Sequence, residues 1–437
     1  MSDLFLTRRW FDIPENAKNH LTQIELLKHL DFAVESPVLQ NITLAAGRRS
    51  YKTERMAKRW GVKTAIKYPN KKIWYGAPTQ GQGVKIFWED LKGLINPAYI
   101  KNKSETKHEI ELWNNTKIEL FGLKEYERIE GQRADICIVT ETQQCEMEAY
   151  SQTLQPILND SNGVFLFEGR PFGKNHFYDF YMKGVNKERN WYSAWWSAED
   201  ILSDEQIQAA KETLSLIDYQ REYQASFETG TSTVYYSYSK ENNKKHIIDT
   251  NKPIIIACDF NATDKPMSWA IGQANGNNTY WTKTFQYQYT NTETMSDIVY
   301  DYLKENYKDK PLHIIFYGDY AGTQNKSNSS QTDWEIIEKK FRNIGKYEKR
   351  IKPCLSIRDS VGATNALLCN ANNVRRMLID YENCKELAID WQKAEWKDNS
   401  REIKEVGMIG HLCRAIDYYS DYEFPITGKP KITHRFN

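Results

Sequence analysis

The sequence predicts an α/β protein built of two domains. Two stretches alternate short apolar strands with helix-like segments, and a polar stretch with little periodicity separates them at about 229–252. Such alternation is typical of mostly parallel sheets covered by helices. The chain length of 437 residues also corresponds to two or three domains of ordinary size.

The composition excludes several other classes of protein. With 40% hydrophobic and 27% charged residues, the chain is expected to fold around a sizeable core. No apolar run approaches the ~20 residues of a membrane span, and the start lacks a signal-like apolar segment, so we expect a cytoplasmic protein without a membrane partner. The seven cysteines form no CxxC pair, which favours reduced thiols over a zinc site. A net charge of +1 excludes a polybasic protein but allows a local nucleic-acid-binding patch.

The first stretch opens with a predicted amphipathic helix over 20–32, where leucines and isoleucine recur at helical spacing. Strands are expected over 41–46, 72–76, 117–121, 136–139 and 164–167, and helices over 203–227. The second stretch opens with an apolar strand over 253–258 that ends at Asp259. Strands over 267–272 and 279–285 flank an Asn-Gly-Asn-Asn turn, a hairpin signal. A helix over 294–307, a strand over 312–317 ending before Asp319, and a last helix with His411 and Asp417 follow.

Residues 46–53, AGRRSYKT, lie between a predicted strand and a predicted helix. A phosphate-binding loop needs a glycine turn with exposed backbone N–H groups, a lysine for the phosphates and a Ser or Thr for magnesium. Lys52 and Thr53 occupy the last two places, and the helix that follows would add its N-terminal dipole. Ala46 and Tyr51 stand where the pattern has glycines. An ordinary basic strand-to-helix turn is therefore the alternative.

A second segment, ADICIVTE (134–141), resembles the other half of such a site. ATPases of this class have an apolar strand followed by an acid for magnesium and an acid that activates the attacking water. Glu141 stands in the place of the general base. Thr140 replaces the magnesium acid, so we expect weaker magnesium binding. The alternative is a buried strand with an acid at its exposed end.

The order of AGRRSYKT, GQRADICIVTE and GVFLFEGRPFGKNHFYDFY resembles the large subunit of tailed-bacteriophage terminases, over nearly the whole chain. The resemblance implies a P-loop ATPase domain of the ASCE type over 1–228, with a helical lid at about 190–228. It further implies a linker over 229–252 and a ribonuclease H-like nuclease domain over 253–437. The bound nucleotide would be ATP. The residues implied for its site are Gly47, Arg48, Arg49, Ser50, Lys52 and Thr53, with Gln23 as an adenine contact.

The resemblance also implies residues that act around this site. Arg128 and Arg133 are both candidates for an arginine that acts on a neighbouring subunit, and solvated surface arginines are the alternative. The turn Gly169-Arg170-Pro171 would couple hydrolysis to motion, with Arg170 in place of the family's usual threonine.

Acids in the second stretch predict a metal-dependent nuclease. Asp259 and Asp319 follow two apolar strands, which are neighbours in a ribonuclease H-like sheet, so both carboxylates would reach one edge. Two-metal phosphodiester cleavage needs such converging carboxylates around two Mg²⁺ or Mn²⁺ ions. Asp417 is the expected third ligand, with Asp421, Glu423 and Glu405 as alternatives. Asp264 is either an auxiliary ligand or a loop cap, and His411 either orients a ligand or packs in the core.

A basic run over 339–352 holds seven basic residues against one acid. It either follows a DNA backbone or forms a solvated helix face.

The terminase resemblance implies a motor that hydrolyses ATP to move viral double-stranded DNA into the procapsid and that cuts concatemeric DNA. The implied partners are a portal protein, a small terminase subunit and further copies of this chain in a ring, of five subunits, in the host-cell cytoplasm. Two alternatives remain: an ATPase-nuclease of DNA repair or defence, and a non-catalytic DNA-binding scaffold derived from such a motor.

Overall fold

The computed structural model describes residues 10, 12–227, 233–261, 265–307, 310–323, 331–353, 356–397 and 402–426. The predicted auxiliary acid Asp264 lies outside them. The chain forms two compact units, Met1–Ile207 with Gln220–Thr229, and Gln208–Tyr219 with Gly230–Asn437. The segment predicted as a lid is thereby divided between the units. No helix among the described residues is both long and apolar enough to cross a membrane.

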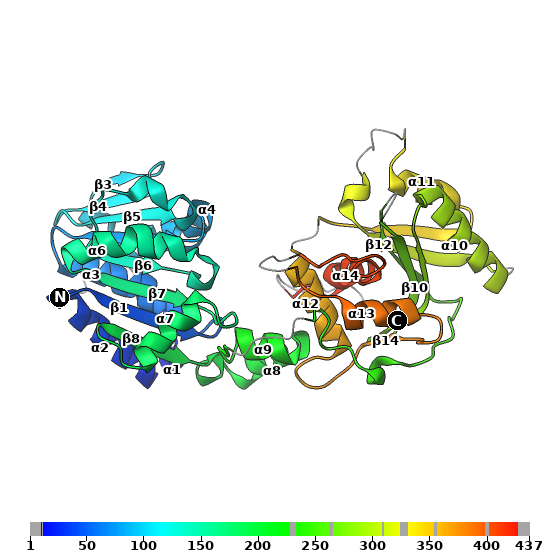
Figure 1. Ribbon diagram of the computed structural model, residues 1–437, viewed down its shortest axis with the longest axis horizontal. Helices are drawn as coiled ribbons and strands as arrows, with labels where there is room; N and C mark the ends of the chain where they lie inside the picture. Colours follow the sequence, from blue (N-terminus) through cyan, green and yellow to red (C-terminus); the bar gives the residue numbers. More distant parts are fainter. Residues whose placement is uncertain are drawn as a thin grey trace. The chain divides into compact units, whose positions relative to one another are not determined.

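The first unit is built on an eight-stranded sheet with the order β3-β4-β5-β2-β6-β7-β1-β8 (Figure 1). The six strands from β5 to β8 run parallel, and β3 and β4 add an antiparallel edge. The strands are β1 (Gln40–Ala46), β2 (Lys72–Ala77), β3 (Ile100–Ser104), β4 (Glu109–Leu112), β5 (Lys117–Gly122), β6 (Ile136–Val139), β7 (Val164–Gly169) and β8 (Trp191–Trp196).

The helices of this unit cover both faces of the sheet. The α-helices are α1 (Glu15–Lys18), α2 (Leu21–Val34), α3 (Trp60–Lys67), α4 (Gln80–Gly83), α5 (Glu89–Leu94), α6 (Gln155–Ser161) and α7 (His176–Val185). Short π-helical segments are η3 (Lys52–Arg59), η4 (Val84–Trp88) and η8 (Ala149–Leu154). Short 3-10 segments are η5 (Pro97–Tyr99), η6 (Leu123–Ile129), η7 (Thr142–Gln144) and η9 (Ala198–Asp200). The helices α8 (Asp204–Thr213) and α9 (Leu216–Glu222) each cross from one unit to the other.

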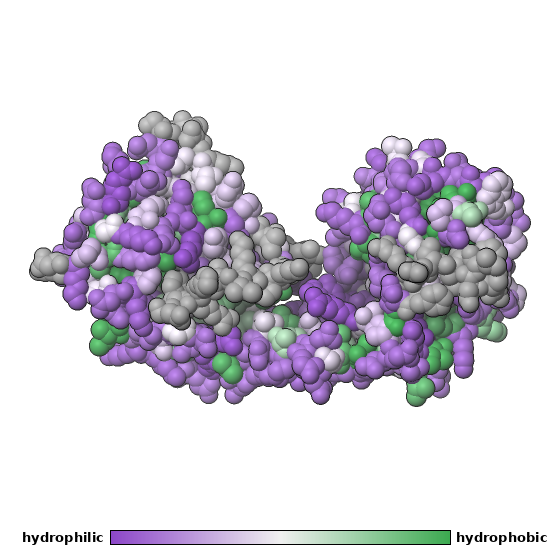
Figure 2. Space-filling model, turned by 180° about the vertical axis from the view of Figure 1, so that it is seen from behind, coloured by the Kyte–Doolittle hydropathy of each residue, from purple (hydrophilic) through white to green (hydrophobic). Residues whose placement is uncertain are grey.

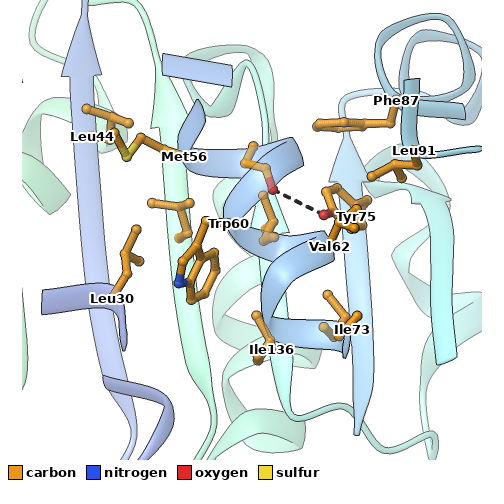
Figure 3. Close-up of a cluster of buried hydrophobic side chains, with 14 of the residues drawn as sticks. Leu30, Leu44, Met56, Trp60, Val62, Ile73, Tyr75, Phe87, Leu91 and Ile136 are labelled. Atoms are coloured by element: carbon orange, nitrogen blue, oxygen red, sulfur yellow. Dashed lines mark hydrogen bonds between the residues drawn. The ribbon is translucent and has the colours of Figure 1, made fainter. Parts of the chain in front are cut away.

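The core of the first unit lies on the two faces of the sheet. The central strands β6 and β7 are buried along their whole length, and β1 is buried except at its first residue, which suits parallel strands covered on both sides. On one face, Met56 and Trp60 of the η3–α3 helix pack among Leu44, Ile73 and Tyr75 of β1 and β2 (Figure 3). The Tyr75 hydroxyl donates to the Ala57 carbonyl at 3.1 Å. This packing fixes the helix that follows the predicted phosphate loop.

The second unit is built on a six-stranded sheet with the order β13-β12-β9-β10-β11-β14 (Figure 1). The strands are β9 (Ile254–Asp259), β10 (Met267–Asn275), β11 (Asn278–Tyr287), β12 (Leu312–Gly318), β13 (Gly345–Arg350) and β14 (Met377–Ile379). The hairpin β10–β11 is observed as predicted, and β12 pairs in parallel with β9, so the first and fourth strands are neighbours. The helices are α10 (Thr292–Asn306), α11 (Asp333–Phe341), α12 (Ile357–Leu368), α13 (Lys385–Lys393) and α14 (Leu412–Glu423), with the 3-10 segments η10 (Lys240–Asn242) and η11 (Tyr320–Thr323).

The described part of the predicted linker, residues 233–252, packs within the second unit. Val234 and Tyr235 are buried in one of its core clusters, and Asn242 is buried as well. The Asn242 side chain donates to the carbonyls of Leu368 and Met377 at 2.8 Å. The segment therefore belongs to the second unit's core and is not an exposed joint. On the face of the molecule in Figure 2, hydrophilic residues predominate and hydrophobic ones lie in separate groups.

Candidate functional sites

The predicted phosphate loop connects the central strand β1 to the helix that begins at Lys52. Arg49 and Tyr51 both have a φ of 61°, in the left-handed region that usually needs glycine. Tyr51 stands where the motif has a glycine, and the structure shows that the loop adopts the glycine-like turn with tyrosine in that place. Tyr51 packs against the core of the first unit. That packing is available to a tyrosine and not to a glycine.

The loop is held by side chains from outside it. The Gln23 amide donates to the Ser50 carbonyl at 3.0 Å, and the Trp196 indole donates to the same oxygen at 3.2 Å. Gln23 is fully buried, and its amide oxygen accepts from Arg55 at 3.1 Å. The structure thus gives Gln23, the predicted adenine contact, a role in supporting the loop.

Glu222 and Tyr223, at the end of helix α9 and just after it, contact the start of the loop. A Cβ atom at Gly47 would lie 2.2 Å from the Tyr223 carbonyl oxygen, so this close approach requires glycine. The Arg48 backbone N–H donates to the Glu222 carbonyl at 2.6 Å, and the Arg48 side chain pairs with the Glu222 carboxylate at 2.9 Å. Arg48, predicted to bind phosphate, is therefore engaged by an acid. Arg49, predicted for the same role, is exposed.

Lys52 and Thr53 begin the helix beside the ends of β6 and β7. Lys52 is buried, with 8% of its surface exposed. Burial lowers the pKa of Lys52, and the nearby carboxylates of Glu168 and Glu141 oppose that effect. Thr53 donates its hydroxyl to Glu168 at 2.8 and 3.0 Å. The two predicted phosphate and metal residues and the predicted base thus lie around one point.

Glu168 is a site residue that the sequence interpretation missed. It is the fifth residue of β7 and is fully buried, and the Thr140 hydroxyl donates to it at 2.5 Å. Burial raises the pKa of Glu168, while Lys52 and the two hydroxyl donors lower it. The signal available in the sequence was an acid in an otherwise apolar strand, VFLFEG.

Glu141, the predicted general base, is held by several donors. Its φ of 50° is left-handed, and its carboxylate accepts from Gln143 at 2.7 Å and Gln144 at 3.1 Å. Arg170 pairs with it at 3.4 Å and also pairs with Glu222. Burial favours a raised pKa for Glu141, but Arg170 and Lys52 outweigh burial and lower it. The carboxylate is therefore ionised at neutral pH, as a general base must be.

The predicted coupling turn contains a central ion-pair residue. Arg170 is 18% exposed at its side chain and lies between two carboxylates, those of Glu141 and Glu222. Burial disfavours the charged form, but these acids keep the pKa of Arg170 raised. Gly169 ends β7 and Pro171 is buried directly after the arginine. A threonine here, as in the resembling family, could not bridge these acids.

The two candidate arginines for a neighbouring subunit lie on one exposed stretch. Arg128 is 76% exposed in η6 and pairs with Glu125. Arg133 is exposed in the loop that leads to β6. Both could reach another molecule, and the structure favours neither.

In the second unit, the ends of β9 and β12 bring Asp259 and Asp319 together. Cys258 is in register with Gly318, so the two aspartates are the next residues on adjacent parallel strands, which lie about 4.8 Å apart. The Asp259 carboxylate accepts from Asn261 at 2.6 Å and lies 3.4 Å from the His411 ring. Asn261 and His411, which is 2% exposed, are therefore additional residues of this site. The Asp319 carboxylate accepts from the Ala321 N–H at 2.9 Å.

Asp417 does not join this pair, and its prediction as the third metal ligand is not supported by its placement. It is fully buried, and its carboxylate accepts from Thr364 at 2.6 Å and from Tyr235 and Arg414 at 2.8 Å. Burial raises its pKa to about 6, against the effect of Arg414. Burial raises the pKa of the neighbouring Tyr418, and the negative charges of Asp259 and Asp319 raise it as well, against the effect of Arg414.

Asp417 on α14 thus has a hydrogen-bond partner, Thr364, on α12. The other proposed acids are also paired: Asp421 with Lys352, Glu423 with Arg350 and Glu405 with Lys265. Within the described ranges, no group of three or more His, Cys, Asp or Glu side chains is placed to hold a metal ion. Asp259 and Asp319 are the predicted pair that the fold brings together.

The basic run 339–352 is not a single helix. It covers the end of α11, a turn and the edge strand β13. Several of its charges are paired within the unit, by Lys340 with Asp297, Arg350 with Glu423, and Lys352 with Asp421. These pairs leave less free positive charge than the sequence predicts for a DNA-binding surface.

Comparison with known proteins identifies the fold. No family model matches the chain. Over 261 residues the chain is 26% identical to the terminase large subunit of Escherichia phage T5, covering 56% of this chain and 58% of that protein, which is less than two thirds of its length. The structure matches the large terminase of a thermophilic bacteriophage with a TM-score of 0.62 and 14% identity, covering 92% of this chain and 98% of that chain. The chain has the fold of a large terminase.

The large terminase fold confirms the resemblance found in the motifs and the mixed α/β class. The large terminase of the same thermophilic bacteriophage, in complex with ATP-gamma-S, matches with a TM-score of 0.61 and 15% identity over the same fractions of the two chains. In this chain, the residues around Lys52 and Glu141 lie at the carboxyl ends of strands β1, β6 and β7. The pair Asp259 and Asp319 lies at the carboxyl ends of β9 and β12.

Proposed function

We propose that this protein is the large subunit of a phage DNA-packaging terminase, with an ATPase in the first unit and a nuclease in the second. The observation that carries the proposal is the convergence of Lys52 and Thr53, which follow β1, with Glu141, which follows β6 on the other side of β7. Such a convergence serves the transfer of a phosphoryl group to water. The thermophilic-phage relative, with ATP-gamma-S bound, supports ATP as the nucleotide.

Each residue of the nucleotide site has a defined chemical task. Lys52 neutralises phosphate charge in a buried setting, where its effect is stronger than in water. Glu141, ionised and oriented by Gln143 and Arg170, accepts a proton from the attacking water. The hydroxyl oxygen of Thr53 fits a hard divalent cation such as Mg²⁺. When bound, that ion supplies charge neutralisation on the phosphate oxygens.

The nuclease part of the proposal rests on Asp259 and Asp319. Their carboxylate oxygens fit Mg²⁺ or Mn²⁺, which in a two-metal site activate a water and stabilise the leaving oxygen. His411 and Asn261 hold Asp259 in orientation. A metal site with both ions needs further oxygen donors than these two aspartates. We therefore propose the pair as its base.

The nuclease is tested by cleavage of a supercoiled plasmid with Mg²⁺ or Mn²⁺. We expect metal-dependent cutting that Asp259→Asn abolishes. Asp297→Asn is the matched control, because Asp297 is 53% exposed at its side chain on α10 and lies outside this cluster. Cutting that survives in Asp259→Asn would remove the aspartate pair from the mechanism.

The ATPase is tested by ATP turnover. Lys52→Ala is expected to abolish it, whereas Lys63→Ala, 51% exposed at its side chain in the same helical segment, should leave it unchanged. Unchanged turnover in Lys52→Ala would refute the loop assignment.

The proposed motor would act on viral double-stranded DNA with a portal protein, a small terminase subunit and further copies in a ring of five. The support for these partners is the similarity to the large terminases of phage T5 and of the thermophilic bacteriophage. Stimulation of ATP turnover by procapsids distinguishes this role from a repair or defence enzyme, which needs no procapsid. A protein that neither cuts DNA nor turns over ATP would instead be a DNA-binding scaffold.

A further inference from the structure

Glu168 is a buried carboxylate that the expected mechanism does not use. It has no exposed surface, and its hydrogen bonds come from the hydroxyls of Thr53 and Thr140. Lys52 influences it electrostatically, yet within the described part of the chain no Lys, Arg or His nitrogen forms an ion pair with it. An ionised carboxylate without a paired cation is costly inside a protein. A cation beside Glu168 would therefore stabilise its ionised form, which burial disfavours.

The position of Glu168 matches a gap in the sequence motif. Strands β6 and β7 are parallel, with Val139 in register with Phe167, so Thr140 and Glu168 follow side by side on neighbouring strands. The motif expects the metal acid at Thr140, where this chain has no charge. Glu168 supplies a carboxylate from the neighbouring strand, whose backbone lies about 4.8 Å away. The Thr140 hydroxyl donates to that carboxylate at 2.5 Å.

The contact between Thr53 and Glu168 also indicates a divalent cation at this position. Thr53 is the hydroxyl that the phosphate-loop motif assigns to the metal, and it donates to both oxygens of Glu168, at 2.8 and 3.0 Å. A carboxylate and a hydroxyl next to phosphate are the oxygen ligands that magnesium prefers.

We propose that Glu168 holds the divalent cation of the nucleotide site, in place of the acid that Thr140 replaces. The proposal rests on the nucleotide site proposed above and gives Glu168 a role within it. It also revises the expectation of weak magnesium binding, because the acid has moved to the adjacent strand and is still present.

The test measures binding of Mn²⁺ to the full chain by electron paramagnetic resonance, with and without ADP. Only the ADP-dependent part is counted, because the aspartates of the second unit would bind Mn²⁺ without nucleotide. Glu168→Gln keeps the size of the side chain and removes its charge. The double variant Thr140→Asp with Glu168→Gln returns the acid to the motif's own position. Glu130→Gln, an exposed acid of the same unit, is the control.

We expect Glu168→Gln to weaken ADP-dependent Mn²⁺ binding at least about tenfold, as loss of a ligand or of its support does. ADP binding in EDTA should be unchanged, and the double variant should recover Mn²⁺ binding. If folded Glu168→Gln binds Mn²⁺ as the wild type does, the proposal is overturned. If Glu168→Gln does not fold, Glu168→Asp, which withdraws the charge from Thr140, makes the same comparison. If the wild type binds no ADP with or without Mn²⁺, the nucleotide site itself is wrong, and this inference falls with it.

Discussion

Replacing Arg170 by methionine tests whether the ion pairs of Arg170 with Glu141 and Glu222 keep the Glu141 carboxylate ionised. At 3.4 Å and an effective dielectric constant of about 20, the Arg170–Glu141 attraction is about 5 kcal/mol, part of which is offset by desolvation of the arginine. Glu222 keeps Arg48 at 2.9 Å as a partner, whereas Glu141 loses its ion pair and keeps only the electrostatic effect of Lys52. We expect Arg170→Met to cost about 3 kcal/mol of unfolding free energy in the first unit.

The lowered pKa of Glu141 predicts how the stability difference between wild type and Arg170→Met changes with pH. The folded pKa of Glu141 is lowered below 4.5, so its stabilising contribution is complete above about pH 4.5 and is lost as pH falls through the folded pKa. Arg170→Met removes that contribution and raises the pKa of Glu141. The difference from wild type should therefore be largest at pH 7 and should narrow below about pH 4.5.

Calorimetry at pH 7 and at pH 4 measures this difference. For a unit of this size, about 3 kcal/mol corresponds to a fall in melting temperature of roughly 6–12 °C. Arg170→Lys is the control, because lysine keeps the positive charge but loses the two-pronged geometry of the guanidinium group. Its melting temperature should fall by less than that of Arg170→Met. In ATP turnover, the acidic limb of the pH profile should move to higher pH in Arg170→Met. Equal melting temperatures at pH 7, or a difference that stays constant down to pH 4, would refute the reasoning.

Two further variants test other parts of the structure. Gly47→Ala would place a Cβ atom 2.2 Å from the Tyr223 carbonyl oxygen. We therefore expect thermal unfolding to show a loss of about 2–3 kcal/mol of unfolding free energy, together with weaker ADP binding. Gly81→Ala is the control, because its Cβ atom would have no neighbouring atom within 4 Å, and it should be neutral or stabilising. Asp417 has a folded pKa of about 6 against 3.8, so its stabilising effect is complete below about pH 4 and is lost as pH rises through 6. Asp417→Asn should therefore gain about 3 kcal/mol relative to wild type between pH 4 and pH 7 in urea unfolding, and a constant difference would show that Asp417 does not titrate in this way.

The sequence predicted the central strands well because each is a continuous apolar run between turn formers. It missed β3 and β4, which are rich in Lys, Asn and Glu at a sheet edge, and β8, whose residues WYSAWW fall inside the segment predicted as a helical lid. Residues at the edge or end of a sheet are half exposed, so their patterns are weaker.

The candidate sites show where prediction from sequence ends. Asp259 and Asp319 could be paired from strand order alone, because parallel neighbours end at one edge. Asp417 stays a prediction as a metal ligand, and its hydrogen bond from Thr364 on α12 is a contact that helical spacing alone does not indicate. Glu168 was missed because the motif places its acid on β6, and only the register of β7 brings another one beside it.

The division of the chain between the two units has a practical consequence for dissecting the protein. The polypeptide passes between the units three times, at 207/208, 219/220 and 229/230. The stretch Gln208–Tyr219 packs with the second unit, where Ala371 donates to the Lys211 and Leu214 carbonyls, whereas Glu222 and Tyr223 contact the start of the phosphate loop. If the protein were cut at 228/229, the N-terminal fragment would still carry Gln208–Tyr219, which belongs to the second unit. Buried residues of that stretch, such as Tyr219, would then be exposed. Neither half is thus a contiguous module that a single cleavage could release.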